Sequence, residues 1–277
     1  MRPIRKAAPW LLGVAFATAL FAVLWQTASF YYTGNDDSPI LQTFMGYEGG
    51  IPATFHLYIH TGLAWLLWAL ARVFPGVAWF SVVQVALLWL SAVVLVKSPA
   101  QLSRRHGLTV WPGALAGAIF LAGYALFVVC RISYTTTCAL CGAAAVAQAA
   151  SVDCTAPRRR SVIGPLLGSA ALLLATYSIR QVSVVPALCF WALTLLVKVR
   201  SAFGRGRLPW RNAKPVWTGL LITALLFGGF AGVRAIDIRT NHAEDFLAWQ
   251  NERIRLFDYS DFDTTTTPQT LAKTGWS

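Results

Sequence analysis

Long apolar stretches alternate with short polar segments along most of the chain. A helix needs about 20 apolar residues to cross the roughly 30 Å hydrocarbon core of a bilayer, because it rises about 1.5 Å per residue. Several stretches reach that length, and the pattern predicts about seven spanning helices. Their expected ranges are 9–31, 77–97, 112–131, 133–152, 161–179, 182–198 and 215–236.

The composition of the chain agrees with this pattern. Hydrophobic residues make up 56% of the sequence, charged residues make up 12%, and the mean hydropathy is +0.56. A soluble globular domain carries roughly 25% charged residues. Water cannot solvate a chain this apolar, whereas lipid can. We therefore expect an all-α fold, a polytopic membrane helical bundle with about seven transmembrane helices and an outer interfacial helix.

A further apolar segment, residues 53–74, decides the topology. If it spans the bilayer there are eight helices, and if it lies along the interface there are seven. Lys and Arg are enriched in short cytoplasmic loops. Seven spans place 15 of the 23 basic residues on the cytoplasmic side, whereas eight spans place 11 there and turn three basic clusters outward. We therefore expect seven spans, with 53–74 as an interfacial or re-entrant helix on the outer side.

This topology also assigns a side to each remaining segment. We expect a multi-pass protein of the cell membrane with a cytoplasmic N-terminus. Residues 1–236 would form the transmembrane module, with a first external loop over 32–76, and residues 237–277 an extracytoplasmic tail. Because no further helix follows the tail, we expect the chain to be a truncated form of a longer protein.

The net charge of +12 has a simple explanation in this topology. In a soluble protein such a charge would suggest nucleic acid as a partner. Here the basic residues lie in short loops between apolar spans, and the positive-inside bias of membrane proteins accounts for them. We therefore expect membrane lipids, and no nucleic acid, as partners.

Two pairs of possible metal ligands are present in the sequence. Cys138 and Cys141 form a CxxC pair inside an expected span, and His56 and His60 lie one helical turn apart. A soft-metal site needs more ligands than either pair supplies. The favoured interpretation is packing for the cysteines and a membrane-surface position for the histidines.

Asp36 and Asp37 stand next to each other just beyond the first expected span, and Glu48 follows in the same loop. Adjacent carboxylates at a membrane surface are costly unless they are solvated, paired or metal-bound. One interpretation is chemical, because a carboxylate can act as a general base or hold a divalent cation such as Mg²⁺ or Mn²⁺. The other is a solvated loop start, with an Asp capping a helix that begins at Ser38.

Two arginines, Arg131 and Arg180, are expected at the outer ends of helices, on the same side as the acidic pair. An arginine there can extend to lipid head groups, or it can hold a lipid-linked phosphate with its forked donors. The first interpretation is favoured for Arg131, and both stay open for Arg180. The polar segment 133–137 that follows Arg131 can either line a cavity or join helices.

Taken together, these features resemble the C-type (GT-C) membrane glycosyltransferases. The stretches that carry the resemblance are the acidic pair in the first external loop, the surface helix before the second span, and the seven-span module. More narrowly, "NDDSPILQTFMGYEGGIPATFH", "FPGVAWFSVVQ" and "NERIRLFDYSDFD" are similar to an uncharacterised bacterial multi-pass membrane protein family. Two departures from the superfamily are the single Pro52 at the surface helix and the absence of a second outer acidic site.

The resemblance implies transfer of a sugar from a polyprenyl-phosphate donor on the outer face of the membrane. It implies catalysis by Asp36 and Asp37, with or without a bound divalent metal, and donor binding by Arg180. Further candidates for substrate binding are Glu48, His56 and Arg131. The alternative is a non-catalytic or truncated membrane scaffold or lipid-handling protein.

Overall fold

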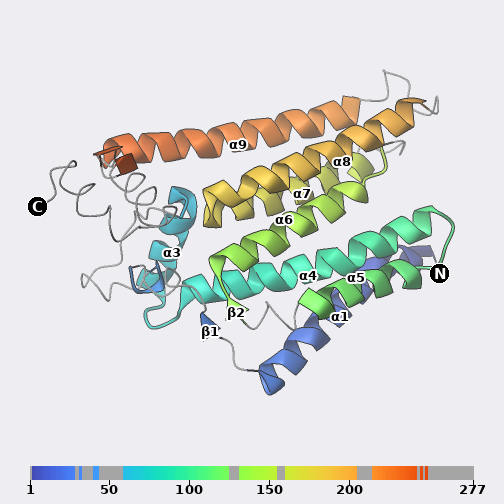
Figure 1. Cartoon of the computed structure of the whole chain (residues 1–277), viewed down its shortest axis with the longest axis horizontal. Helices are drawn as coiled ribbons and strands as arrows, with labels where there is room; N and C mark the ends of the chain where they lie inside the picture. Colours follow the sequence, from blue (N-terminus) through green and yellow to red (C-terminus); the bar gives the residue numbers. More distant parts are fainter. Residues whose placement is uncertain are drawn as a thin grey trace, which may run out of the picture. The chain divides into compact units, whose positions relative to one another are not determined.

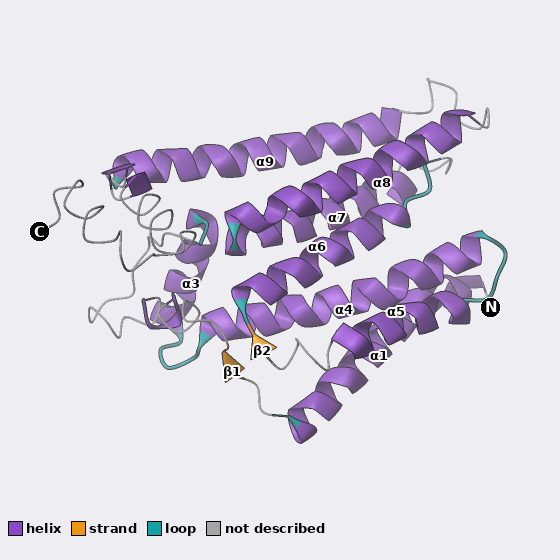
Figure 2. Ribbon diagram, viewed as in Figure 1, coloured by secondary structure: helices purple, strands orange, loops and turns teal. Residues whose placement is uncertain are grey.

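Helices form along all seven of the long apolar stretches. The computed structural model describes residues 2–28, 31–32, 40–43, 59–124, 131–154, 160–204, 214–241, 244–245 and 247–248. The helices are α1 (Arg2–Thr27), α3 (Thr61–Val73), α4 (Trp79–Arg105), α5 (Trp111–Tyr124), α6 (Tyr134–Ala150), α7 (Arg160–Ile179), α8 (Val184–Gly204) and α9 (Lys214–Thr240) (Figure 1). The 3₁₀ turn η2 (Gln181–Ser183) precedes α8, and two short strands complete the described fold (Figure 2).

The all-α membrane fold expected from the sequence is confirmed. Five of the described helical stretches are long and apolar enough to cross a membrane. These are Ala7–Thr27, Trp79–Arg105, Val162–Ile179, Gln181–Phe203 and Lys214–Thr240. The described parts of α5 and α6 are shorter, at 14 and 17 residues. The protein is therefore a membrane protein built from apolar helices.

The seven long helices run alternately in opposite directions (Figure 1). For example, Trp89 Nε1 on α4 donates to Thr18 Oγ1 on α1 at 3.2 Å, and the Lys97 ammonium lies 4.4 Å from the ring centroid of Trp10. These pairs can form only if α1 and α4 are antiparallel. One direction is shared by α1, α5, α7 and α9, and the other by α4, α6 and α8.

The helix α3 does not take part in this alternation. It has 13 residues, about 20 Å at the helical rise, which is too short to cross a 30 Å hydrocarbon core. At its start, His60 N donates to Ser178 O near the end of α7 at 2.8 Å, and just beyond its end Phe74 O accepts from Trp79 Nε1 at the start of α4. Both ends of α3 thus lie at the same end of the bundle, and its depth in a membrane stays a prediction.

A two-residue parallel pairing joins distant parts of the chain at this end. Strand β1 (Tyr31–Tyr32) follows α1, and strand β2 (Arg131–Ile132) precedes α6. Tyr31 pairs with Arg131 and Tyr32 with Ile132. The first helix was expected to reach residue 31, but it ends at Thr27 because the chain becomes extended for this pairing.

At the opposite end of the bundle, two cations cap the last turn of α6. Lys198 Nζ donates to Ala150 O and, at 2.7 Å, to Val152 O, while Arg105 Nη1 donates to Ser151 O. The last carbonyls of a helix have no partner within the helix, and positive side chains stabilise them. The caps fasten α4 and α8 to the end of α6.

We expect Lys198→Met to lower the free energy of unfolding by about 1–3 kcal/mol, because two carbonyl groups lose a charged donor. The measurement is reversible unfolding of the purified protein in mixed micelles. Arg200→Met is the matched control, since Arg200 lies on the same helix and is exposed. Equal stability of the two variants would contradict the capping role.

The chain divides into two compact units, Met1–Ala231 and Gly232–Ser277. In the second unit, Arg234 Nη1 and Asp237 Oδ2 form an ion pair at 3.4 Å, and Asn241 Nδ2 donates to Asp237 Oδ1 at 3.0 Å. Most of the expected tail, 237–277, lies outside the described residues.

Candidate functional site

Arg180 lies between α7 and η2, where its side chain is fixed against the start of α6. Its Nη1 donates to Thr135 Oγ1 at 2.6 Å, and its guanidinium carbon lies 5.0 Å from the ring centroid of Tyr134. Its backbone N–H donates to Thr176 O at 2.9 Å and so continues the last turn of α7. The side chain is only partly buried. Because a guanidinium has several N–H donors, Arg180 can bind an anion without giving up these contacts.

The polar segment 133–137 builds the support for Arg180. Ser133 caps α6, since its side chain accepts from the N–H of Thr135 at 3.1 Å, and Thr136 Oγ1 donates to Ser133 O at 3.0 Å. These bonds fix the first turn of α6 and present Thr135 to the guanidinium. The hydroxyl of Thr137 is buried and has no partner among the described residues. The segment thus joins helices, which is one of the two interpretations given above, and it also positions Arg180.

The described parts of the first loop also lie at this end. Ile40 is 1% exposed and packs in one cluster with Ile59, Tyr134 and Ile179. Tyr134 contacts the guanidinium of Arg180, and Ile179 precedes Arg180 in the chain. The pairing of β1 with β2 brings the other side of the loop to the start of α6. The structure therefore places the residues that flank the acidic pair at the same end of the bundle as Arg180.

Among the predicted catalytic and substrate-binding residues, the structure describes both the backbone and the side chain of Arg180. Arg131 is described in its backbone, as part of β2, and its side chain lies outside the described part. Four further candidates lie outside the described residues, namely Asp36, Asp37, Glu48 and His56. Their assignment stays a prediction.

His60, the possible partner of His56, has a structural role. It is 1% exposed, its Nδ1 accepts from Gly62 N at 3.0 Å, and its Nε2 lies 2.8 Å from Phe230 O. Because Nδ1 accepts an N–H, Nε2 must carry the proton and donate it to the carbonyl. The ring therefore caps α3 and ties it to α9, and neither nitrogen is available to a metal in this arrangement.

The cysteine pair also packs between helices. Cys138 Sγ donates to Thr176 O at 3.4 Å, and Ser91 Oγ donates to Cys141 Sγ at 3.3 Å. Both side chains are buried, and neither forms a disulfide. Outside the spans, burial raises the pKa of the Cys154 thiol. Within the described ranges, no group of three or more His, Cys, Asp or Glu residues could hold a metal ion.

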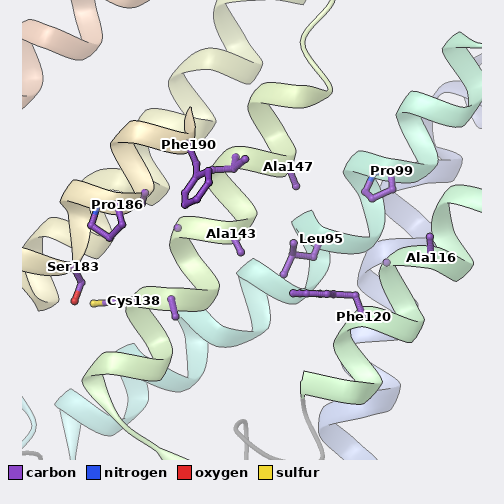
Figure 3. A pocket seen from close by; sticks show the side chains of 15 residues that line it. Leu95, Pro99, Ala116, Phe120, Cys138, Ala143, Ala147, Ser183, Pro186 and Phe190 are labelled. Carbon is purple, nitrogen blue, oxygen red and sulfur yellow. The ribbon is translucent and has the colours of Figure 1, made fainter. Parts of the chain in front are cut away.

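An apolar groove of about 590 Å³ lies between the helices that meet near Arg180. Cys138 and Ser183 lie at one end of it, and Phe120 and Phe190 project from its opposite walls (Figure 3). Its walls come from α4, α5, α6 and α8, and Thr135 and Arg180 precede Cys138 and Ser183 by three residues each. The groove has the lining expected for a hydrocarbon chain, with a fixed cation near one end.

Sequence reasoning missed two features of the molecule. The sequence pattern does not connect Tyr134 with Arg180, and it predicts a helix that ends at Lys97. The structure corrects this: α4 continues through Pro99 to Arg105, and Lys97 is 3% exposed. The small and apolar residues around Pro99 were a signal that the helix continues.

A scan against protein-family models found no match, and neither did searches of the curated proteins and the solved structures.

Proposed function

We propose that the protein is a membrane glycosyltransferase that uses a polyprenyl-phosphate sugar as donor. In this proposal the groove between α4, α5, α6 and α8 holds the polyprenyl chain, Arg180 binds the donor phosphate, and Asp36 or Asp37 acts on the acceptor. The observation that supports this proposal most is the position of the Arg180 guanidinium, which Thr135 and Tyr134 hold near the end of an apolar groove.

The chemistry of the transfer gives Arg180 its role. When the bond between sugar and phosphate breaks, negative charge builds on the leaving phosphate. A donor group that is already fixed in place stabilises that charge without reorganising during the reaction. The starts of α6 and α8 lie beside Arg180, and the positive ends of their helix dipoles favour the same charge.

The acidic pair is within reach of this site along the chain. Asp37 precedes Ile40 by three residues, which span at most about 10 Å when fully extended. Ile40 belongs to the same buried cluster as Tyr134, and the guanidinium of Arg180 lies over the ring of Tyr134. A carboxylate there can take the proton from an acceptor hydroxyl, or it can hold a divalent cation.

The distribution of charge supports an outer position for the site. At the end of the bundle opposite Arg180, the described residues include ten Lys and Arg residues, namely Arg2, Arg5, Lys6, Lys97, Arg104, Arg105, Arg160, Lys198, Arg200 and Lys214. The positive-inside rule assigns that end to the cytoplasm. In this proposal the protein lies in the cell membrane with a cytoplasmic N-terminus. Helix α3 and Arg180 are then on the outer side, and so is the C-terminal tail.

We expect Arg180→Gln to lower kcat/KM for a polyprenyl-phosphate sugar by about 10²-fold, because the leaving phosphate loses a charged donor. Sugar transfer by the purified protein in lipid nanodiscs measures this, with donor binding followed separately. Arg180→Lys is expected to recover part of the loss, since it restores the charge without the forked geometry.

Arg72→Gln is the matched control for this substitution. Arg72 lies at the same end of the bundle, but its guanidinium stacks on Trp68 at 4.3 Å from the ring centroid. Full turnover by Arg180→Gln would remove the arginine from the mechanism. Donor binding without any turnover by the wild-type protein would favour a lipid-handling protein instead.

A further inference from the structure

A second cavity, of about 550 Å³, lies between α1, α4, α6 and α7 near the end of the bundle opposite Arg180. Its polar lining consists of Lys97, Gln101 and Gln148, beside the ring of Trp10. The other lining side chains are apolar and lie along α4 from Leu87 and along α7 from Gly164. The cavity is therefore an apolar channel with one polar, positively charged end.

The ammonium group of Lys97 is the unusual element of this cavity. The residue is 3% exposed, its Nζ donates to Gln148 Oε1 at 2.6 Å, and it lies 4.4 Å from the ring centroid of Trp10. Ser98 Oγ donates to the same Gln148 oxygen at 3.1 Å. All of these partners are neutral, so they orient the lysine without balancing its charge.

No described acidic residue lines the cavity, and the cation of Arg105 is on the same helix. A charged side chain within a membrane is costly unless it has an opposite charge or access to water. The side-chain oxygen of Gln101 is also buried and has no hydrogen-bond partner among the described residues. The polar end of the cavity thus has a net positive charge and an unused acceptor.

The shape of the cavity matches one lipid leaflet. From Leu87 to Gln101, α4 rises about 21 Å, compared with about 15 Å for the hydrocarbon of one leaflet. Glycines on α7 keep the space open: a Cβ at Gly164 would meet no atom within 4 Å, and one at Gly168 would meet only the amide of Gln148, at 3.9 Å. A hydrocarbon chain can therefore lie along the cavity beneath a polar head.

We propose that this cavity binds an anionic phospholipid, with the phosphate of its head group on Lys97 and an acyl chain along α4 and α7. The ligand class follows from charge complementarity at one end and an apolar lining over the rest. In the orientation proposed above, the lipid comes from the cytoplasmic leaflet. The site is separate from that of Arg180, which lies at the start of α6 while Gln148 lies near its end.

Native mass spectrometry of the full chain, released from micelles doped with phosphatidylglycerol or phosphatidylcholine of equal chain length, tests the proposal. We expect the wild-type protein to retain phosphatidylglycerol at least about fivefold more than phosphatidylcholine. Lys97→Met is expected to abolish the preference. Gly164→Leu is expected to lower retention of both lipids, because its side chain fills the cavity while Lys97 stays in place.

Two matched controls accompany these variants, and each variant is first shown to be folded by thermal melting. Lys214→Met removes an exposed lysine, and Gly123→Leu adds a side chain where a Cβ would meet nothing within 4 Å. Both are expected to keep the wild-type preference.

Three results would overturn the proposal. The first is equal retention of the two lipids by the wild-type protein, which would leave Lys97 as a tie between helices. The second is an unchanged preference in folded Lys97→Met, or unchanged retention of both lipids in folded Gly164→Leu. The third is retention of inorganic phosphate, added alone to the same micelles, equal to that of phosphatidylglycerol, which would show an anion site that does not need a lipid chain.

Discussion

Sugar transfer is expected to fall by about 10²–10⁴-fold when the catalytic member of the acidic pair is replaced, as Asp36→Asn or Asp37→Asn. An amide has nearly the size of a carboxylate, but it can neither take a proton nor hold a divalent cation strongly. The two single variants distinguish the residues, and the more severe loss identifies the carboxylate that acts on the acceptor.

The loss should appear in kcat rather than in donor binding. In the proposed site Arg180 and the apolar groove bind the donor, and the two carboxylates take no part in donor binding. A variant with normal donor affinity and slow transfer would match that division of roles. If the carboxylate instead holds a metal, a chelator should inhibit the wild-type protein and excess Mg²⁺ or Mn²⁺ should restore it.

The control for the acidic pair is Glu244→Gln, which neutralises an exposed carboxylate expected on the same side of the membrane. Its turnover should equal that of the wild-type protein. Undiminished transfer by both Asp variants would exclude the pair from the mechanism. Cysteine labelling that located residues 36 and 180 on opposite sides of the membrane would exclude it as well.

The helices could be predicted from the sequence because the bilayer imposes a length and a composition on them. The range 161–179 corresponds to α7 within one residue, and 133–152 corresponds to α6 within two. Where small or basic residues follow an apolar stretch, the predicted helix ends before the helix in the structure. The best example is α4, which runs eight residues past the expected end at Lys97.

The candidate site could be predicted only in part. The positions of Arg131 and Arg180 at one end of the bundle followed from the charge distribution. The hydrogen bond of Arg180 to Thr135 could not be foreseen, because it joins side chains 45 residues apart and depends on how α6 and α7 pack. The same reason hid the cavity at Lys97, whose partner Gln148 lies 51 residues away.

Glycines let the backbone of α5 approach α4 closely, a contact that no hydrophobic pattern reveals. Gly113 and Gly117 form a GxxxG pair that faces Pro99 and Leu95 on α4. Proline has no N–H, so Pro99 leaves the carbonyl of Leu95 without its normal helical partner. In a membrane, small residues at such interfaces allow van der Waals contact between backbones, which drives helix association.

Gly117→Leu is therefore expected to lower the free energy of unfolding by about 3 kcal/mol or more, because α5 must move away from α4. A Cβ at this position would lie 2.9 Å from Val96 Cα and would also overlap Leu95 O. Both are backbone atoms, which cannot relieve the overlap by a change of rotamer. Gly123→Leu, on the same helix but with open space around it, should unfold like the wild-type protein. Unfolding in mixed micelles measures both, and equal stability of the two leucine variants would contradict the close packing of α4 and α5.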